Sequence, residues 1–231
     1  MTATAYATTD AVVQPLNARL AELHAERVRT WDPAVLQINI DQRAELVAAA
    51  SADDRWPMVG DAIADAELID VESGAFRLQA RTACAPTVLL FFRFAGCPAC
   101  NIALPYYNET LWPALRARGV ALIAVSPQRP DRLIEIKQRH GLDFAIASDP
   151  ENGLGRRLGI TFTANAATQA QRTPNGPWIG ETTGTGTWEL PQPAVILLDR
   201  LNIVRFFDVS PDWLVRTEAE TIITAIDSLS L

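Results

Sequence analysis

Two cysteines separated by two residues, Cys97 and Cys100, have the spacing in this sequence that is best suited to chemistry. They follow the apolar run at residues 87–92 and precede residues 98–118, whose composition predicts a helix. A cysteine at the first turn of a helix faces free backbone N–H groups and the positive end of the helix dipole, and both favour thiolate over thiol. A second cysteine three residues on is near enough to attack a mixed disulfide. The spacing therefore predicts a reversible dithiol–disulfide pair.

The order of the two cysteines along the helix assigns them different roles. Residues three apart lie on one helix face, so we expect the Cys97 sulfur to be partly exposed and Cys100 to lie one turn in and more buried. Cys97 is then the nucleophile and Cys100 the resolving thiol. The alternatives are buried packing residues or a zinc site, but zinc needs four ligands and the chain adds only Cys84, His24 and His140. We expect Cys84 to be a packing residue, with a resolving or intermolecular role as its alternative.

Four further side chains are candidates near this pair. Arg93 ends the apolar run four residues before Cys97, where its guanidinium would stabilise a thiolate and hydrogen-bond a peroxide oxygen; the alternative is a solvated charge. Glu189 is either a proton acceptor or, as we expect, a surface carboxylate. Trp178 and Trp188 either cover the cysteines or pack the segment that carries them. The two histidines are expected to be surface residues or to be satisfied by hydrogen bonds.

The composition narrows the class of protein. The chain has 231 residues, 48% of them hydrophobic and 20% charged, which is ordinary for a globular protein with a real core. Its net charge of −7 argues against nucleic-acid binding, which needs clustered Lys and Arg. No stretch approaches the about 18 apolar residues of a membrane span. Residues 1–10 lack the layout of a signal peptide, so we expect a cytoplasmic protein with reducible thiols.

The first part of the chain is predicted to be mainly helical. Residues 11–55 are rich in helix formers, and Asp32 followed by Pro33 is typical of a helix start. Residues 67–71 and 75–79 are predicted to pair as a hairpin. The leucines of the first helix form a stripe at helical spacing: Leu16, Leu20 and Leu23.

Strands and helices then alternate. Strands are expected at 87–92, 120–125, 144–147, 194–198 and 203–207, and helices at 98–118, 130–140, 150–158 and from 211 to the end. Residues 164–190 show no clear period and are expected to form a long loop. This order predicts an α/β fold, a mixed central β-sheet flanked by helices, with an N-terminal helical extension at 1–56 and the main domain at 57–231. With the cysteines at the first strand-to-helix turn, that is a thioredoxin-like fold.

The segment 91–101, Phe-Phe-Arg-Phe-Ala-Gly-Cys-Pro-Ala-Cys-Asn, resembles the active-site segment of peroxiredoxin-like proteins. These belong to the alkyl hydroperoxide reductase/thiol-specific antioxidant family, which typically shows an aromatic residue and then Arg-Gly-Gly-Trp-Cys-Pro-x-Cys. Further segments resemble the family in order and spacing, at residues 59–68, 124–128, 148–151 and 188–194. The resemblance covers residues 57–228.

Three positions depart from the pattern of that family. Residues 94–96 are Phe-Ala-Gly where the subgroup has Gly-Gly-Trp. Typical peroxiredoxins also carry Thr or Ser three residues before the peroxidatic cysteine and Arg at the start of a late strand, where this chain has Phe94 and Pro193. Thioredoxins carry a cis-proline that faces their cysteine pair. By that resemblance we expect Pro193 to be a cis-proline beside the sulfurs, with Pro191 as the rival.

The resemblance implies a thiol-dependent oxidoreductase with an antioxidant role in cell redox homeostasis. Its Cys97 would attack a hydroperoxide or a disulfide; with peroxide it would become a sulfenic acid, with which Cys100 condenses to a disulfide. An external thiol reductant, such as a thioredoxin or glutathione system, would restore the dithiol. No metal or organic cofactor is implied, no nucleic acid or membrane partner is expected, and a homodimer is possible. The alternative function is a non-catalytic redox sensor or partner-binding protein on the same fold.

Overall fold

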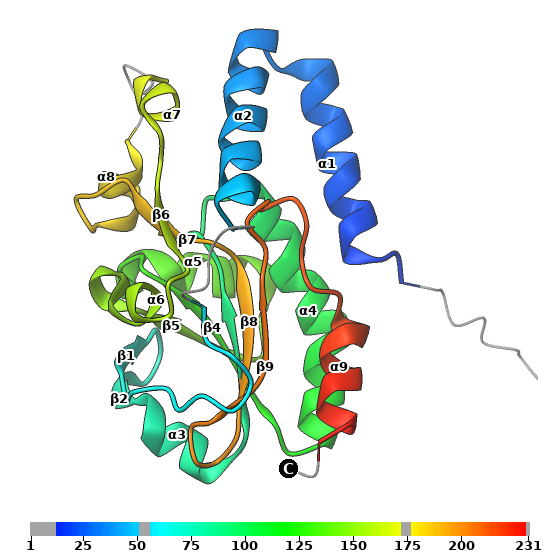
Figure 1. Cartoon of the computed structure of the whole chain (residues 1–231), viewed down its shortest axis with the longest axis vertical. Coiled ribbons are helices and arrows are strands. Elements are labelled where there is room, and N and C mark those ends of the chain that lie inside the picture. Colours follow the sequence, from blue (N-terminus) through cyan, green and yellow to red (C-terminus); the bar gives the residue numbers. More distant parts are fainter. Residues whose placement is uncertain (1–12, 51–55, 172–176, 230–231) are drawn as a thin grey trace, which may run out of the picture.

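The computed structural model describes residues 13–50, 56–171 and 177–229. The ends of the helical region predicted at 11–55, part of the loop predicted at 164–190 and the last two residues of the final predicted helix lie outside the described residues. The molecule is built around a seven-stranded mixed sheet with the strand order β2-β1-β5-β4-β3-β8-β9 (Figure 1). Its strands are β1 (Glu67–Asp70), β2 (Gly74–Arg77), β3 (Thr87–Phe91), β4 (Ala121–Ser126), β5 (Ala145–Ser148), β8 (Ala194–Leu198) and β9 (Val204–Val209).

The middle of the sheet is parallel and its edges are antiparallel. Strand β3 pairs in parallel with β4 and antiparallel with β8, so that Leu89 lies between Ile123 and Ile196. Strands β1 and β2 form the predicted hairpin, and β8 pairs antiparallel with β9. The α/β class, the mixed sheet and the β3-to-helix junction at the cysteines are therefore confirmed.

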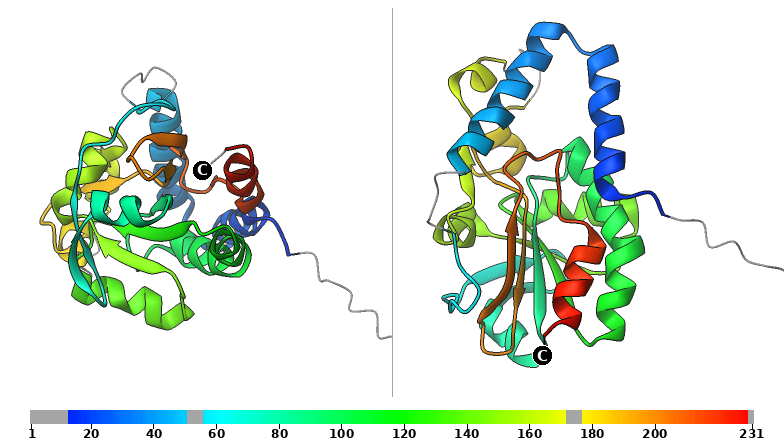
Figure 2. Two further views of the ribbon diagram at one scale, coloured as in Figure 1. Left: turned by 90° about the horizontal axis from the view of Figure 1, so that it is seen from below. Right: turned by 45° about the vertical axis from the view of Figure 1, so that its right-hand side comes forward.

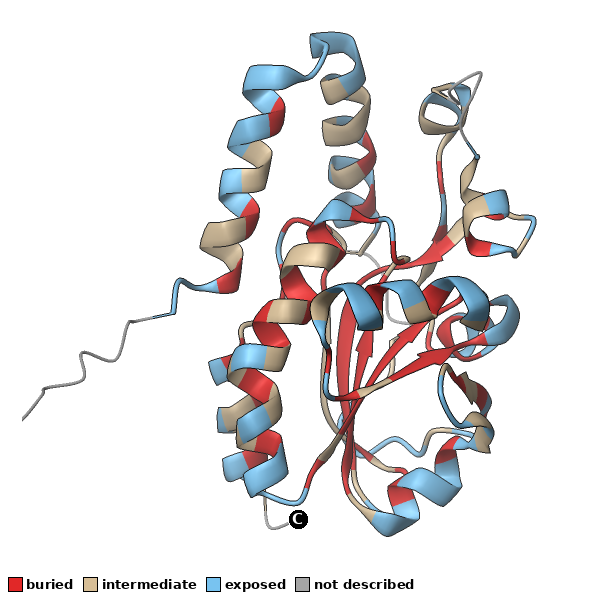
Figure 3. Cartoon of the chain, turned by 180° about the vertical axis from the view of Figure 1, so that it is seen from behind, coloured by how far each residue is buried: buried red, intermediate tan, exposed pale blue. Residues whose placement is uncertain are grey.

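Helices cover both faces of this sheet. One face packs against α4 (Pro98–Ala117), α5 (Pro130–His140) and α9 (Ala219–Asp227), and the other against α3 (Leu78–Cys84) and α6 (Gly153–Arg157), which follows the short 3₁₀ helix η1 (Pro150–Asn152). Alternate residues of β3 point to opposite faces, with Leu90 in the first core and Leu89 in the second. Because β3 is buried on both faces, its sequence is a continuous apolar run. Figure 3 shows the buried strands inside and the exposed outer faces of the helices.

The N-terminal region forms a helical hairpin of α1 (Leu16–Thr30) and α2 (Pro33–Ala50). Asp32 caps α2 as predicted, since its carboxylate accepts a hydrogen bond of 2.8 Å from the backbone N–H of Ala34. The hairpin projects beyond one end of the sheet, and the start of α1 runs beside α4 (Figure 2). Leu16, Leu20 and Leu46 belong to the same core as α4. The assignment of residues 1–56 and 57–231 to an extension and a domain stays a prediction.

Four segments differ from the prediction. Residues 78–84 form α3 instead of continuing the hairpin, because Leu78 turns into the second core. The helix expected at 150–158 is broken by the positive φ of Glu151 and Asn152. It restarts where the Asp149 carboxylate accepts backbone hydrogen bonds of 2.9 Å from Leu154 and from Gly155.

The last helix begins at Ala219 and not near residue 211, because Trp213 and Leu214 pack as an irregular segment in the core. Residues 164–190 are more ordered than expected. Strands β6 (Thr161–Thr163) and β7 (Glu189–Pro191) pair antiparallel and bracket two short helices, α7 (Ala166–Ala170) and α8 (Ile179–Thr183). Across the described ranges, none of the helices has the length and apolar character that a membrane crossing requires.

Candidate active site

Cys97 and Cys100 lie at the junction between β3 and α4. Cys97 is the N-cap residue of α4, and its backbone N–H donates to the carbonyl of Phe94 at 3.1 Å. Cys100 lies in the first turn of the helix, and the two thiols lie close enough together to affect each other's pKa. Both cysteines are in the free thiol form. The strand, the turn and the helix start therefore bring the two sulfurs together as the spacing predicted.

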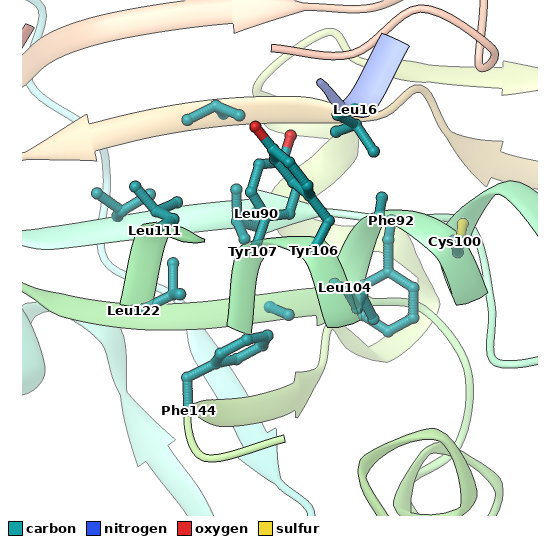
Figure 4. Packing of buried hydrophobic residues seen from close by; sticks show 14 of the residues in the cluster. Leu16, Leu90, Phe92, Cys100, Leu104, Tyr106, Tyr107, Leu111, Leu122 and Phe144 are labelled. Carbon is teal, nitrogen blue, oxygen red and sulfur yellow. The ribbon is translucent and has the colours of Figure 1, made fainter. Parts of the chain in front are cut away.

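The expected exposure of Cys97 is wrong. Its exposed fraction is 2%, and that of Cys100 is 0%. Cys97 belongs to an apolar cluster that also contains Leu46 of α2, Phe162 of β6 and Trp213. These residues come from segments far from the motif, and the cluster that they form with Cys97 buries the start of α4. Figure 4 shows Cys100 on α4, at the end of the row of core side chains.

Two arginines act on the sulfur of Cys100. The Nη2 of Arg216 donates to it at 3.6 Å, and the backbone N–H of Arg93 also acts to lower its pKa. Arg216 is itself held in place, because its Nε donates to the carbonyl of Trp213 at 3.0 Å. Arg216 comes from the segment before α9, more than 100 residues after the cysteines, and sequence reasoning did not identify it.

These contacts decide where the pair carries its charge. Burial would raise the pKa of Cys100, but the hydrogen bond from Cys97 and the charge and hydrogen bond of Arg216 hold that pKa well below its ordinary value. The hydrogen bond to Cys100 and burial raise the pKa of Cys97. The two thiols therefore titrate as a coupled pair, in which the contact with Arg216 favours negative charge on Cys100.

Arg93 follows β3 as predicted, but it is not a solvated strand-end charge. Its guanidinium carbon lies 4.2 Å from the ring centroid of Trp213 and 6.0 Å from that of Phe162, which stack on each other. Cation–π contacts of this kind fix the plane of a guanidinium. The charge of Arg93 also acts to lower the pKa of Cys97. The structure thus brings the predicted Arg93 to the predicted cysteine.

The turn between β3 and α4 is held by side chains that sequence reasoning missed. The Oε1 of Gln128 accepts a 2.7 Å hydrogen bond from the backbone N–H of Ala95, and its Nε2 donates to the carbonyl of Thr182 at 3.0 Å. The Nδ2 of Asn101 donates to the carbonyls of Ala95 and Cys97, at 2.7 and 2.9 Å. Asn101 follows the motif directly and Gln128 ends one of the family-like segments, so their positions were the available signal.

Pro193 is not a cis-proline: its peptide bond, like every other in the described chain, is trans. The backbone runs extended from β7 into β8, since the N–H of Gln192 donates to Ile160 and the carbonyl of Pro193 accepts from Ser210, each at 2.7 Å. A trans bond continues that extended path. Pro193 still lies near the site, because it lines a small cavity together with Arg216.

The other candidates, Glu189 and the two tryptophans, make structural contacts. Glu189 forms a 2.6 Å ion pair with Arg156 and so is a paired carboxylate. Trp178 and Trp188 pack on each other with ring centroids 5.0 Å apart.

Cys84 and the two histidines are predicted to lie outside the catalytic chemistry. Cys84 is exposed and therefore is not the packing residue we expected. His140 is satisfied by Asn101, whose Oδ1 lies 2.8 Å from its Nε2. His24 lies on α1, and its Nδ1 is buried without a hydrogen-bond partner, so it is neither the surface residue nor the satisfied residue that we expected. In the described ranges no three His, Cys, Asp or Glu side chains are grouped so that they could hold a metal ion.

The chain matches a family model described as the AhpC/TSA family over residues 59–207, which is more than half of its length. A comparison with curated proteins found no match. Similar solved structures include the peroxidoxin BcpB from Mycobacterium tuberculosis, with 17% identity, a TM-score of 0.56, and coverage of 75% of this chain and 98% of that one. A thiol peroxidase from Chromobacterium violaceum has 18% identity, a TM-score of 0.57, and coverage of 75% and 88%.

Another similar structure is reduced Prx3 from Vibrio vulnificus in complex with hydrogen peroxide. It has 20% identity and a TM-score of 0.59, and the match covers 74% of this chain and 99% of that one. At these identities the likeness shows the fold, which is the peroxiredoxin form of the thioredoxin-like architecture.

Proposed function

This chain belongs to the AhpC/TSA family and is a peroxiredoxin-like enzyme of the thiol peroxidase type, and from that premise we propose that it reduces hydroperoxides with the Cys97–Cys100 pair. The observation that carries the proposal is the close placement of the two thiols at the start of α4, with Arg216 on the inner sulfur. It supplies a nucleophile, a proton acceptor and a resolving thiol within one helical turn. The substrate we propose is a hydroperoxide, and the electron donor is an external thiol.

The first step uses the proton of Cys97. Cys97 passes its proton to the nearby Cys100 sulfur, and the Cys97 thiolate attacks the terminal oxygen of the hydroperoxide. The O–O bond breaks, Cys97 becomes a sulfenic acid, and the departing alkoxide takes the proton from Cys100 to leave as an alcohol. The peroxide is thereby reduced by two electrons, and Cys100 is again a thiolate. Arg216 stabilises that thiolate as it did in the resting pair.

The second step closes the disulfide. The Cys100 thiolate attacks the Cys97 sulfenic acid, the S–O bond breaks, and the hydroxide that leaves takes up one proton from the buffer to become water. Two external thiols then restore the dithiol through a mixed disulfide on Cys97, and they leave as an external disulfide. A reducing compartment such as the cytoplasm would maintain that donor. The role of Pro193 is to shape the small cavity that it lines together with Arg216.

Because both sulfurs are buried, the substrate reaches Cys97 only when the cover over the start of α4 moves. Disulfide closure needs little displacement by comparison, since the two thiols already lie close together in one helical turn. We therefore expect slow entry followed by fast closure. Under stoichiometric peroxide, the intramolecular disulfide would accumulate and a free sulfenic acid would not.

The test is stopped-flow mixing of the reduced protein with hydrogen peroxide, with mass spectrometry of the product. We expect one equivalent of peroxide to give a disulfide between Cys97 and Cys100, and Cys97→Ser to abolish the reaction. Cys100→Ser would leave a sulfenic acid on Cys97 that a dimedone probe captures. Cys84→Ser serves as the matched control and should react as the wild type does.

Three outcomes would overturn the proposal or its assignment of roles. Peroxide consumption no faster than that of a small free thiol would exclude the peroxidase. If insulin disulfides are then reduced in its place, the chain is a disulfide reductase; if neither substrate turns over, it is a redox sensor. A sulfenic acid trapped on Cys100 in Cys97→Ser, formed at the wild-type rate, would reverse the two roles.

A further inference from the structure

Two arginines beside the cysteine pair have guanidinium groups with no anionic partner. Arg27 of α1 is only 6% exposed, and its Nη1 is buried without a hydrogen-bond partner. The Nε of Arg93 is likewise buried and unpartnered. In the part of the chain that the structure describes, neither side chain forms an ion pair. A buried guanidinium without a counter-charge is costly, so its presence in a folded core needs an explanation.

The charges around the site do not balance. Cys97, Arg43 and Arg93 are all close enough to Arg27 to influence its pKa. Arg43 of α2 is paired with Asp212, at 2.9 Å, and Arg216 is paired with the Cys100 sulfur. Arg43 and Arg216 therefore each have a negatively charged partner. Arg27 and Arg93 are left with two positive charges that nothing in the described chain neutralises.

The electrostatics of Arg27 agree with this count. Burial lowers its pKa, and the positive charges of Arg43 and Arg93 lower it further, while Cys97 acts in the opposite direction. An anion placed between these groups would relieve both the burial and the repulsion. The guanidinium fork is well suited to this task, because it presents parallel N–H donors that match the two oxygens of a carboxylate.

Aromatic rings hold both guanidinium groups in place. The guanidinium carbon of Arg27 lies 4.8 Å from the ring centroid of Trp31, and that of Arg93 lies 4.2 Å from the centroid of Trp213. A guanidinium that lies over a ring uses its face for the contact and keeps its N–H edge for a ligand. Their orientation is therefore fixed before any ligand arrives, which reduces the entropy lost on binding.

We propose that Arg27 and Arg93 bind a carboxylate of the substrate beside Cys97, so that the enzyme acts on carboxylate-bearing hydroperoxides. This inference rests on the proposed function and specifies the substrate of the same site. One unpartnered donor on each guanidinium gives two donors for the two oxygens of a carboxylate. The carboxylate stays chemically unchanged while the O–O bond is cleaved. The N-terminal hairpin, which carries Arg27, thereby becomes part of the specificity of the site.

The test compares two alkylating reagents of nearly equal size, anionic iodoacetate and neutral iodoacetamide, on the reduced Cys84→Ser protein. Labelling of Cys97 is followed by mass spectrometry of its peptide. Because both reagents must pass the same cover, the ratio of their rates reports the preference for a carboxylate. We expect this ratio to exceed that of 2-mercaptoethanol by about ten- to a hundredfold, the range of a charge-assisted hydrogen bond. The net charge of −7 works against iodoacetate, so a preference must arise locally.

Variants of Arg27 separate the site from general effects of charge. Arg27→Gln should lower the ratio about tenfold, and Arg27→Lys should keep much of it because the charge remains. Arg118→Gln removes the same charge at an exposed pair with Asp227 and should leave the ratio unchanged. Circular dichroism reports whether each variant is folded. Acetate added to the wild type should slow iodoacetate more than iodoacetamide, which tests the site without any substitution.

The failure of this inference differs from the failure of the proposed function. A wild-type ratio equal to that of 2-mercaptoethanol would overturn the carboxylate site, even if hydrogen peroxide is reduced quickly. A high ratio that Arg27→Gln leaves unchanged would overturn the role of Arg27. A high ratio of iodoacetate to iodoacetamide labelling that depends on Arg27, in a protein that does not reduce hydrogen peroxide, would support the carboxylate site. It would overturn the proposed peroxidase activity. A carboxylate-bearing hydroperoxide that reacts no faster than its methyl ester would overturn the substrate class.

Discussion

Arg216 is the residue that most directly sets the charge of the cysteine pair, through its 3.6 Å contact with the Cys100 sulfur. Because the pKa of Cys100 is lowered, its thiolate is present above that lowered pKa and is lost as the pH falls through it. In Arg216→Gln the stabilising charge is absent and the thiolate is lost at a higher pH. We expect the rate of peroxide reduction at neutral pH to fall by about tenfold, the worth of one charge-assisted hydrogen bond.

The measurement for Arg216 is the pH dependence of ultraviolet thiolate absorbance, together with the peroxide rate, in both proteins. Arg118→Gln is the control for charge. If Arg216 acts through its charge, the rate of peroxide reduction by Arg216→Gln must recover at alkaline pH, because the variant can still form the thiolate there. An Arg216→Gln profile that overlays the wild type would show that the arginine only packs against the sulfur.

At the scale of elements, the turn between β3 and α4 depends on Gln128, whose side chain satisfies the backbone N–H of Ala95. Replacing Gln128 with Leu leaves that buried N–H without an acceptor, at a cost of about 1–3 kcal/mol in the free energy of unfolding. We also expect slower peroxide reduction, since the turn precedes Cys97 directly. Urea denaturation and stopped-flow rates measure the two effects. Gln37→Leu, which removes an exposed hydrogen bond to Asp41, should change neither.

Another link between elements is the capping of α1 by a distant carboxylate. Glu218 accepts backbone hydrogen bonds from Leu16 and Asn17, at 2.9 and 2.8 Å, and so caps α1 from the segment before α9. Glu218→Gln removes the charge that faces the positive end of the helix, and we expect the free energy of unfolding to fall by about 1–2 kcal/mol.

Hydrogen exchange checks where this loss is felt. In Glu218→Gln, exchange should rise in the first turn of α1 and around Arg216, because Asn17 binds both the backbone N–H and the carbonyl of Arg216. Glu109→Gln breaks an exposed pair with Arg19 of the same helix and should cost less than about 0.5 kcal/mol. Equal losses in the two variants would contradict the capping role.

At the scale of the whole molecule, the N-terminal hairpin and the sheet share one apolar core. Leu20 of α1 is 0% exposed within that core, so Leu20→Ala should cost about 2–4 kcal/mol in the free energy of unfolding. We expect circular dichroism and tryptophan fluorescence to report one coincident transition in this variant. Val28→Ala, at a position on α1 that is 57% exposed, should be nearly neutral. A separate early transition in Leu20→Ala would show that the hairpin unfolds independently.

The sequence by itself determined the features that depend on local order. The continuous apolar run at β3 and the helix-forming composition of residues 98–118 are local signals, and each has a direct backbone consequence. They placed the cysteine pair at a strand-to-helix junction, and together with the family-like segments they predicted the peroxiredoxin-like fold. Arg93 was also within reach of sequence reasoning, because it lies four residues from Cys97.

Only the tertiary structure decided what surrounds the two sulfurs. Arg216, Arg27 and Gln128 reach the site from segments far away in the chain, and no local pattern links them to the cysteines. Burial of Cys97 and the trans bond at Pro193 follow from the same long-range packing, which covers the helix start and extends the chain into β8. The pKa of a thiol depends on charges within a few ångströms in space, whatever their separation in sequence. Which sulfur holds the charge is therefore a property of the folded molecule.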